Sequence, residues 1–137
     1  MTEIESSKGD GAVTGEMRTL LRIEGLMLFG TATLLYWISG ASWWLFGGLL
    51  LAPDLSFLAY LAGPRLGAIG YNALHTTTGP LLLALTGVVM HWPLAASIAL
   101  IWLAHIGIDR ALGYGLKYAT GFGFTHLGRV GPATRSP

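Results

Sequence analysis

Apolar residues dominate two long stretches of the chain, residues 25–53 and 66–108, and neither stretch contains Asp, Glu, Lys or Arg. A run of about 18 or more apolar residues with few charges is long enough to cross a bilayer as a helix. Polar or helix-breaking residues interrupt each stretch, at Ser39-Gly40-Ala41-Ser42 and at His91-Trp92-Pro93. The pattern therefore predicts four transmembrane helices, over about residues 19–38, 43–62, 66–90 and 93–112.

The composition also indicates a membrane protein. Charged residues make up 11% of the chain, whereas a soluble domain carries about a quarter. A soluble bundle of these helices would have no polar outer face. The net charge of +1 comes without a basic stripe, so we expect no nucleic-acid partner. Without cysteine, the chain can form neither disulfides nor thiolate metal sites.

We predict one membrane domain, residues 18–112, between two polar ends. The leader, residues 1–17, has no hydrophobic periodicity and is predicted to be disordered. The tail, residues 113–137, alternates glycines with aromatic residues, which suits a segment at the membrane interface. Gly121 and Gly123 would allow Thr125-His126 to fold back over the membrane domain, but we favour an exposed tail histidine.

All eight basic residues fall where a four-helix bundle brings them to one side of the membrane. They are Lys8, Arg18 and Arg22 at the first helix, Arg65 between the second and third, and Arg110, Lys117, Arg129 and Arg135 from the end of the fourth. Short segments rich in Lys and Arg stay in the cytoplasm. We therefore predict an all-α, up-down-up-down bundle with both termini cytoplasmic, and with Trp43, Trp44 and Trp92 at the opposite interface.

Five ionisable residues lie inside the predicted helices: Glu24, Asp54, His75, His105 and Asp109. An ionisable group at mid-bilayer costs about 2.5–3.5 kcal/mol, so each of them is a functional candidate. At about 1.5 Å per residue, Asp54 and His75 lie roughly 13 Å from the cytoplasmic surface and His105 roughly 7 Å. His105 and Asp109, like Tyr71 and His75, are four residues apart and share a helix face. Each helix thus contributes a polar group to one layer in the cytoplasmic half of the membrane.

The first interpretation of this layer is a metal site. Its ligands would be Asp54, His75, His105 and Asp109. Histidine and carboxylate ligands on facing helices are how helical bundles hold Zn, Fe or Mn. We therefore expect one divalent metal, Zn, Mn or Fe, as the cofactor.

Three other interpretations compete with the metal site. In a charge-pair scaffold, three arginines would neutralise three acids and fix the helix packing. Those residues are Arg22, Arg65, Arg110, Glu24, Asp54 and Asp109. A proton or ion path would use the same layer, although the outer half has no ionisable residue except His91 at its surface. A haem held by His75 and His105 is the fourth interpretation, although carboxylates fit poorly against a porphyrin face.

Several segments of the chain indicate a family. LAPDLSFLAYLAGPRLGAIGYNALH (51–75), IWLAHIGIDRALGYGLKYATGF (101–122), THLGR (125–129) and RIEG (22–25) resemble a family of small bacterial membrane proteins of unknown function, numbered 4260. The resemblance covers about residues 18–131, and it implies a four-span protein of the bacterial inner membrane but no particular activity. Its motif positions here are Glu24, Asp54, Arg65, Asn72, His75, His105, Asp109, Arg110 and His126.

From these residues we predict a metal-dependent membrane hydrolase that acts on a lipid-like or amphipathic substrate. Glu24 would be the general base toward a metal-bound water. Arg65, Arg110 and Asn72 would bind the substrate, the arginines by holding a phosphate-like group. The alternative is a non-enzymatic protein of the lipid bilayer, which binds a partner or transports a small ion and whose buried charges are structural.

Cysteine labelling tests the predicted orientation, because the natural chain has no cysteine to react. Single cysteines at Ser42 and Trp92 should react with a membrane-impermeant maleimide from the periplasm. A cysteine at Leu66, next to the basic Arg65, should react only from the cytoplasm. Labelling of position 42 from the cytoplasmic side would overturn the orientation and the depths derived from it.

Overall fold

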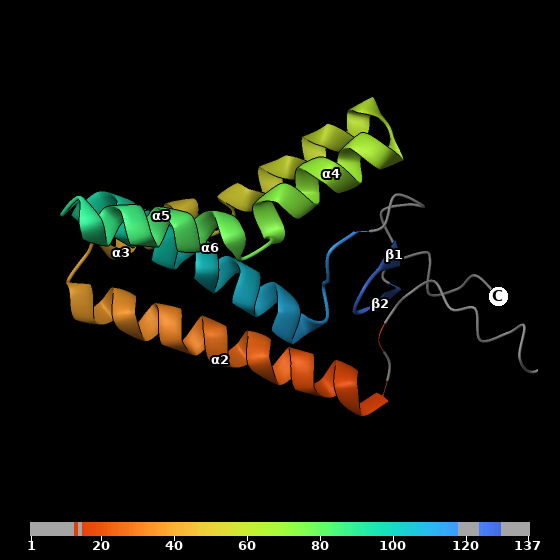
Figure 1. The fold of residues 1–137 in the computed structure, drawn as a ribbon, viewed down its shortest axis with the longest axis horizontal. Coiled ribbons are helices and arrows are strands. Elements are labelled where there is room, and N and C mark those ends of the chain that lie inside the picture. The colour runs from red at the N-terminus through yellow and green to blue at the C-terminus, as the bar shows by residue number, and fades with distance from the viewer. Residues whose placement is uncertain (1–12, 14, 118–123, 130–137) are drawn as a thin grey trace, which may run out of the picture.

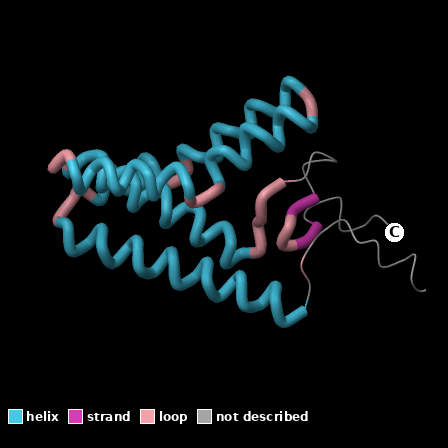
Figure 2. The backbone as a smooth tube through the Cα atoms, in the orientation of Figure 1, coloured by secondary structure: helices cyan, strands magenta, loops and turns pink. Residues whose placement is uncertain are grey.

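The computed structural model describes residues 13, 15–117 and 124–129. The described chain is helical except for one short hairpin, as Figures 1 and 2 show. Its elements are α2 (Gly15–Ser39), α3 (Trp43–Leu49), the 3₁₀-helix η1 (Ala52–Ala62), α4 (Pro64–His75), α5 (Thr78–Val89), α6 (Pro93–Leu112), β1 (Phe124–Thr125) and β2 (Gly128–Arg129). β1 and β2 are antiparallel, with Phe124 opposite Arg129 and Thr125 opposite Gly128.

Three helical segments are long and apolar enough to cross a membrane: Gly15–Ser39, Trp43–Ala62 and Pro93–Leu112. The last of these has the predicted bounds. Pro93 occupies its first turn and Gly113, at φ 93°, ends it in the left-handed conformation that glycine tolerates. α2 begins at Gly15, four residues before the predicted start. The predicted helical, membrane-compatible fold is thus confirmed for the described residues.

The prediction of one continuous helix over residues 66–90 is wrong. The chain forms α4 and α5 instead, each of 12 residues. Each is about 18 Å long, against about 30 Å of bilayer hydrocarbon. Thr76 between them is extended (φ −88°, ψ 148°). In a continuous helix the ring of Pro80 would clash with the Thr76 carbonyl, so the break relieves this contact.

The second predicted helix is also interrupted. α3 ends at Leu49, and η1 then continues as a 3₁₀-helix of 11 residues with Pro53 in its first turn. Runs of 3₁₀-helix longer than about 3–4 residues are uncommon and mark strain or a functional hinge. Asp54 follows this break directly, and His75 directly precedes the break between α4 and α5. Both interruptions therefore lie beside a predicted metal ligand.

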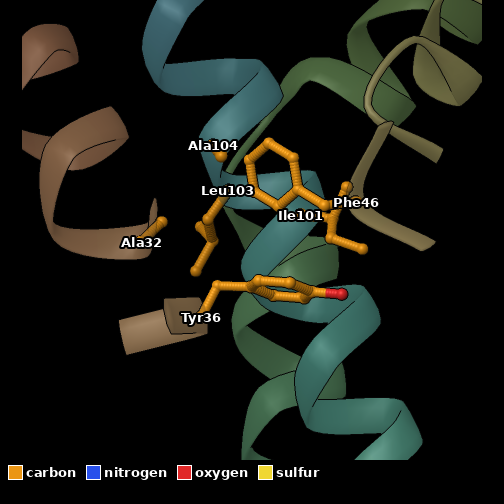
Figure 3. Packing of buried hydrophobic residues seen from close by; sticks show 6 residues of the cluster. All are labelled: Ala32, Tyr36, Phe46, Ile101, Leu103 and Ala104. Carbon is orange, nitrogen blue, oxygen red and sulfur yellow. The ribbon is translucent and has the colours of Figure 1, made fainter. Parts of the chain in front are cut away.

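α6 is the central helix. α2 and α5 pack along it, while α4 packs along η1 as a pair that diverges from α2 (Figures 1 and 2). The hydrophobic core joins α2, α3 and α6 through Ala32, Tyr36, Phe46, Ile101, Leu103 and Ala104 (Figure 3). Elsewhere large apolar side chains face outward, such as Leu61 at 88% exposure. An apolar exterior of this kind suits lipid rather than water.

Glycines set the distance between several helices. The sequence offers six for close packing: Gly25, Gly30, Gly47, Gly48, Gly67 and Gly70. Gly25, Gly67 and Gly70 do lie against a neighbouring element, but a Cβ at the other three would meet nothing within 4 Å. Gly107 of α6, which is not among these six glycines, also lies against a neighbouring helix. A Cβ there would lie 2.5 Å from the Phe29 nitrogen of α2, so α2 and α6 touch backbone to backbone.

Substituting these glycines tests the α2–α6 contact. Gly107→Ala should lower the melting temperature in detergent, because overpacking costs about 1–3 kcal/mol and the obstructing atoms are backbone. Gly30→Ala is the matched control. It adds the same methyl group to an open position and should hold or raise the melting temperature, since Ala is the better helix former by about 1 kcal/mol. Equal effects at both positions would refute the contact.

Candidate metal centre

The four residues predicted as metal ligands meet at one point. Asp54 lies in the first turn of η1, His75 is the last residue of α4, and His105 and Asp109 lie one turn apart on α6. One ligand atom from each lies within 4.8 Å of those of the other three. The two helix breaks and the central position of α6 bring these groups together.

Five of the six distances between the four candidate ligand atoms lie between 3.0 and 3.4 Å, and all six are within 4.8 Å. The Nε2 atoms of His75 and His105 are 3.0 Å apart. Each Nε2 lies 3.3–3.4 Å from Asp54 Oδ1 and 3.2–3.4 Å from Asp109 Oδ2. Ligands about 2.0–2.1 Å from a tetrahedral Zn²⁺ are separated by about 3.3–3.4 Å. The cluster therefore has the dimensions of a single first-row metal site.

A hydrogen bond to the backbone determines which ring nitrogen of His75 faces the cluster. Its Nδ1 lies 2.8 Å from the Tyr71 carbonyl oxygen, which can only accept, so Nδ1 carries the proton. In the neutral ring Nε2 then directs a lone pair toward the two carboxylates. A histidine ligand held through its other nitrogen is the usual arrangement around bound metals.

The cluster is closed behind the histidines and more open at the carboxylates. The His75 and His105 side chains are 4% and 2% exposed, whereas those of Asp54 and Asp109 are 33% and 18% exposed. Converging lone pairs repel unless a positive charge lies between them. The two Nε2 atoms, 3.0 Å apart, are close enough to share a proton, and the 3.2–3.4 Å contacts between histidine nitrogens and carboxylate oxygens would equally accommodate a metal ion between the four atoms.

The comparisons with known proteins identify a family but no activity. The family model described as "Domain of unknown function (DUF4260)" matches residues 18–130. The chain belongs to this family. No curated protein and no solved structure was found to match it. The resemblance seen in the sequence is thereby confirmed.

In the DUF4260 structure, the other predicted site residues lie outside the group of four possible ligand atoms. Glu24 is exposed on α2, where it lines a cleft with Thr77 and Arg110. Nη2 of Arg110 donates to the His75 carbonyl at 3.3 Å. Arg65 is exposed at the opposite end of α4 from His75. Asn72 pairs with the backbone of Lys117. Their predicted catalytic and substrate-binding roles stay predictions.

The geometry of this DUF4260 chain disfavours two of the competing interpretations. Asp54 and Asp109 contact histidines, and none of the described ion pairs joins either of them to an arginine. The charge-pair interpretation requires both aspartates to pair with arginines. In a haem with two axial histidines, the Nε2 atoms stand about 4 Å apart on opposite sides of the iron. At 3.0 Å no porphyrin fits between His75 and His105.

Sequence reasoning missed the part that the tail plays beside the cluster. Lys117 is only 4% exposed, and its Nζ lies 4.9 Å from the centre of the Tyr71 ring. His126, expected to be exposed, accepts a hydrogen bond at Nδ1 from the Leu116 amide (2.9 Å). Burial lowers the pKa of His126, as does the positive charge of Arg110, in agreement with a neutral acceptor. The glycines before Thr125 were the one signal for this folding back.

Substitution separates a metal site from a charge scaffold. His105→Ala should abolish stoichiometric Zn²⁺ binding, measured by elemental analysis, but still give a folded protein, because losing a neutral imidazole leaves no charge behind. The control is His91→Asn, an exposed loop histidine outside the cluster, which should keep the metal. If the charges were only structural, Asp54→Ala and Arg65→Ala would each lose about 3–5 kcal/mol of stability instead.

Proposed function

We propose that this protein is a metal-dependent membrane hydrolase that acts on a lipid-like or amphipathic substrate. One divalent ion, Zn, Mn or Fe, would be held by Asp54, His75, His105 and Asp109. The observation that carries the proposal is the convergence of four possible ligand atoms within 4.8 Å of one another, with the histidines buried and the carboxylates more exposed. A catalytic metal site needs room for water as a further ligand, for example by expansion to five-coordination. The more exposed carboxylate side of the cluster is where that water and the substrate would enter.

We propose that the protein lies in the bacterial inner membrane as an up-down-up-down bundle with both termini in the cytoplasm. The interrupted pair α4 and α5 would together make the third crossing. The distribution of Lys and Arg supports this orientation. The start of α2 also lies beside the end of α6, where Nε of Arg22 donates to the Ala111 carbonyl at 2.8 Å (Figure 1). The metal site then lies in the cytoplasmic half of the membrane, within reach of lipid headgroups.

The chemistry assigned to the site is ester or phosphoester hydrolysis. A bound divalent ion supplies Lewis acidity and lowers the pKa of water. Glu24, which shares a cleft with Arg110, the neighbour of Asp109, would accept a proton from the water, whose oxygen would bond to the carbonyl carbon or phosphorus. The ester C–O or P–O bond breaks, and the leaving oxygen receives that proton. The Glu24 cleft includes Arg110, next to the ligand Asp109, where a guanidinium would hold an anionic group.

An apolar cavity beside the cluster supports the choice of a lipid-like substrate. Its volume is about 200 Å³, and its walls are Leu49, Ala52, Pro53, Leu74, Ile98, Ile101 and Trp102. Pro53 and Leu74 directly precede the ligands Asp54 and His75. A hydrocarbon chain in this cavity would have its polar end beside the metal.

One feature favours a second candidate function, the transport of a small ion. Transporters often bind ions where membrane helices are interrupted. Here the breaks between α3 and η1 and between α4 and α5 both adjoin a ligand. Proteoliposomes loaded with a zinc-sensitive dye distinguish this candidate, because transport would give Zn²⁺ uptake that His105→Ala abolishes.

The hydrolase is tested with Zn²⁺-loaded protein in nanodiscs and three chromogenic substrates, p-nitrophenyl dodecanoate, acetate and phosphate. We expect turnover that His105→Ala abolishes, with the dodecyl ester preferred over acetate. Glu24→Gln should reduce kcat about 100-fold or more and leave Zn²⁺ bound. Glu16→Gln, an exposed acid on the same helix, should have no effect. Activity no higher than in His105→Ala with all three substrates would contradict the hydrolase.

A further inference from the structure

The tail segment after α6 is joined to α4 by the side-chain amide of Asn72, which pairs with backbone groups as a neighbouring β-strand would. Nδ2 of Asn72 donates to the Lys117 carbonyl at 2.7 Å, and the Lys117 amide donates to Asn72 Oδ1 at 2.6 Å. One side-chain amide thus satisfies both backbone groups of a residue 45 positions away. This pairing fixes where the Lys117 side chain begins.

The hairpin of the tail supports Lys117 from its other side. Lys117 forms an isolated β-bridge with Thr125, and the His126 amide donates to the Leu116 carbonyl at 3.0 Å. Thr125 and Leu127 are fully buried. In Figures 1 and 2 this unit lies at the end of α6, beside the start of α2. Residues 113–117 and 124–129 therefore form a packed unit, which we call the tail clasp.

The clasp places the Lys117 ammonium over the ring of Tyr71, at 4.9 Å from its centre. Such cation–π contacts strengthen when water is excluded, and both residues are buried. Burial lowers the pKa of Lys117 to about 8, and the negative charge of Asp109 opposes this shift. The ammonium is therefore close enough to the cluster to feel the charge of one of its ligands.

Tyr71 in turn holds His75 at two points. The two rings stack at 3.7 Å between centres and 8° between planes. The Tyr71 carbonyl also accepts the Nδ1 proton of His75. Because His75 is the last residue of α4, no further turn of that helix supports its side chain. The Tyr71 ring, the Tyr71 carbonyl and the edge contact with His105 therefore together set the plane of the His75 ring.

We propose that Lys117, held by Asn72 and the tail clasp, is a positioning residue for the metal centre. It acts through Tyr71, by keeping that ring stacked on His75 so that Nε2 points at the other three ligand atoms. This inference rests on the proposed metal site and extends it, since it makes metal affinity depend on a segment outside the membrane helices. Outer-shell partners of metal ligands change affinity by about 10–100-fold.

The experiment uses the full chain and measures affinity by Co²⁺ titration, followed by the visible d–d bands, with Zn²⁺ competition. Lys117→Met keeps the length of the side chain but removes its charge. Because Lys117 acts through Tyr71, the variant should weaken Co²⁺ binding by about 10-fold, the lower end of the range for direct partners of a ligand. Lys117→Arg keeps the cation and should restore near wild-type affinity. Tyr114→Leu, at an exposed tail position, is the control and should bind as wild type. Melting temperatures in chelator detect any general loss of structure.

Each outcome bears on a separate claim. Equal affinity in wild type, Lys117→Met and Lys117→Arg would overturn the positioning role and leave the metal site intact. If wild type binds no more Co²⁺ than His105→Ala, the metal site itself fails. If Lys117→Met does not fold, the Co²⁺ affinity of Tyr71→Leu tests the proposal instead. This substitution removes the stacked ring but keeps the carbonyl, and wild-type affinity in that variant would overturn the proposal.

Discussion

Four ligand atoms of two histidines and two aspartates are forced together inside a largely apolar helical protein, and much of the structure serves this contact. Lipid offers such groups no water, so their lone pairs must be balanced from within the protein or by a bound cation. Burial of both imidazoles leaves only the carboxylate side open. The distances of 3.0–3.4 Å between the histidine nitrogens and their neighbours are compatible with one first-row metal ion between them. This cluster makes the protein a candidate metalloprotein. The hydrolase activity is our proposal for what such a metal would do.

The interrupted helices follow from the same requirement. α6 supplies two ligands from a regular turn, but Asp54 and His75 come from helices that end or begin beside the cluster. Pro53 and Pro80 make each interruption favourable, since an unbroken helix would lack hydrogen bonds there or clash with the proline ring. Close backbone contact at Gly107 then holds α2 against α6. His75 is the last residue of α4. We infer that the tail clasp, acting through Tyr71, keeps the His75 ring from rotating.

Local sequence features predicted part of this arrangement. The bounds of α6 follow from Pro93 and Gly113. The grouping of Asp54, His75, His105 and Asp109 follows from their similar depth and from the spacing of His105 and Asp109. The break at Thr76 was missed because an apolar run hides it, although Pro80 was a signal. The pairing of Asn72 with Lys117 could not be predicted, because it joins residues 45 positions apart and no periodicity encodes it. Gly30 shows the same limit. A glycine suits close helix packing, but a Cβ at this position would meet nothing within 4 Å.

The most direct test of the central claim is X-ray absorption spectroscopy at the zinc edge on protein loaded with one equivalent of Zn²⁺. The account predicts four nitrogen and oxygen neighbours at about 2.0–2.1 Å, with the outer-shell scattering of two imidazoles. His75→Ala, like His105→Ala, should no longer hold one equivalent of zinc. A first shell of about six oxygens without imidazole scattering, or zinc that is lost on gel filtration, would contradict the account.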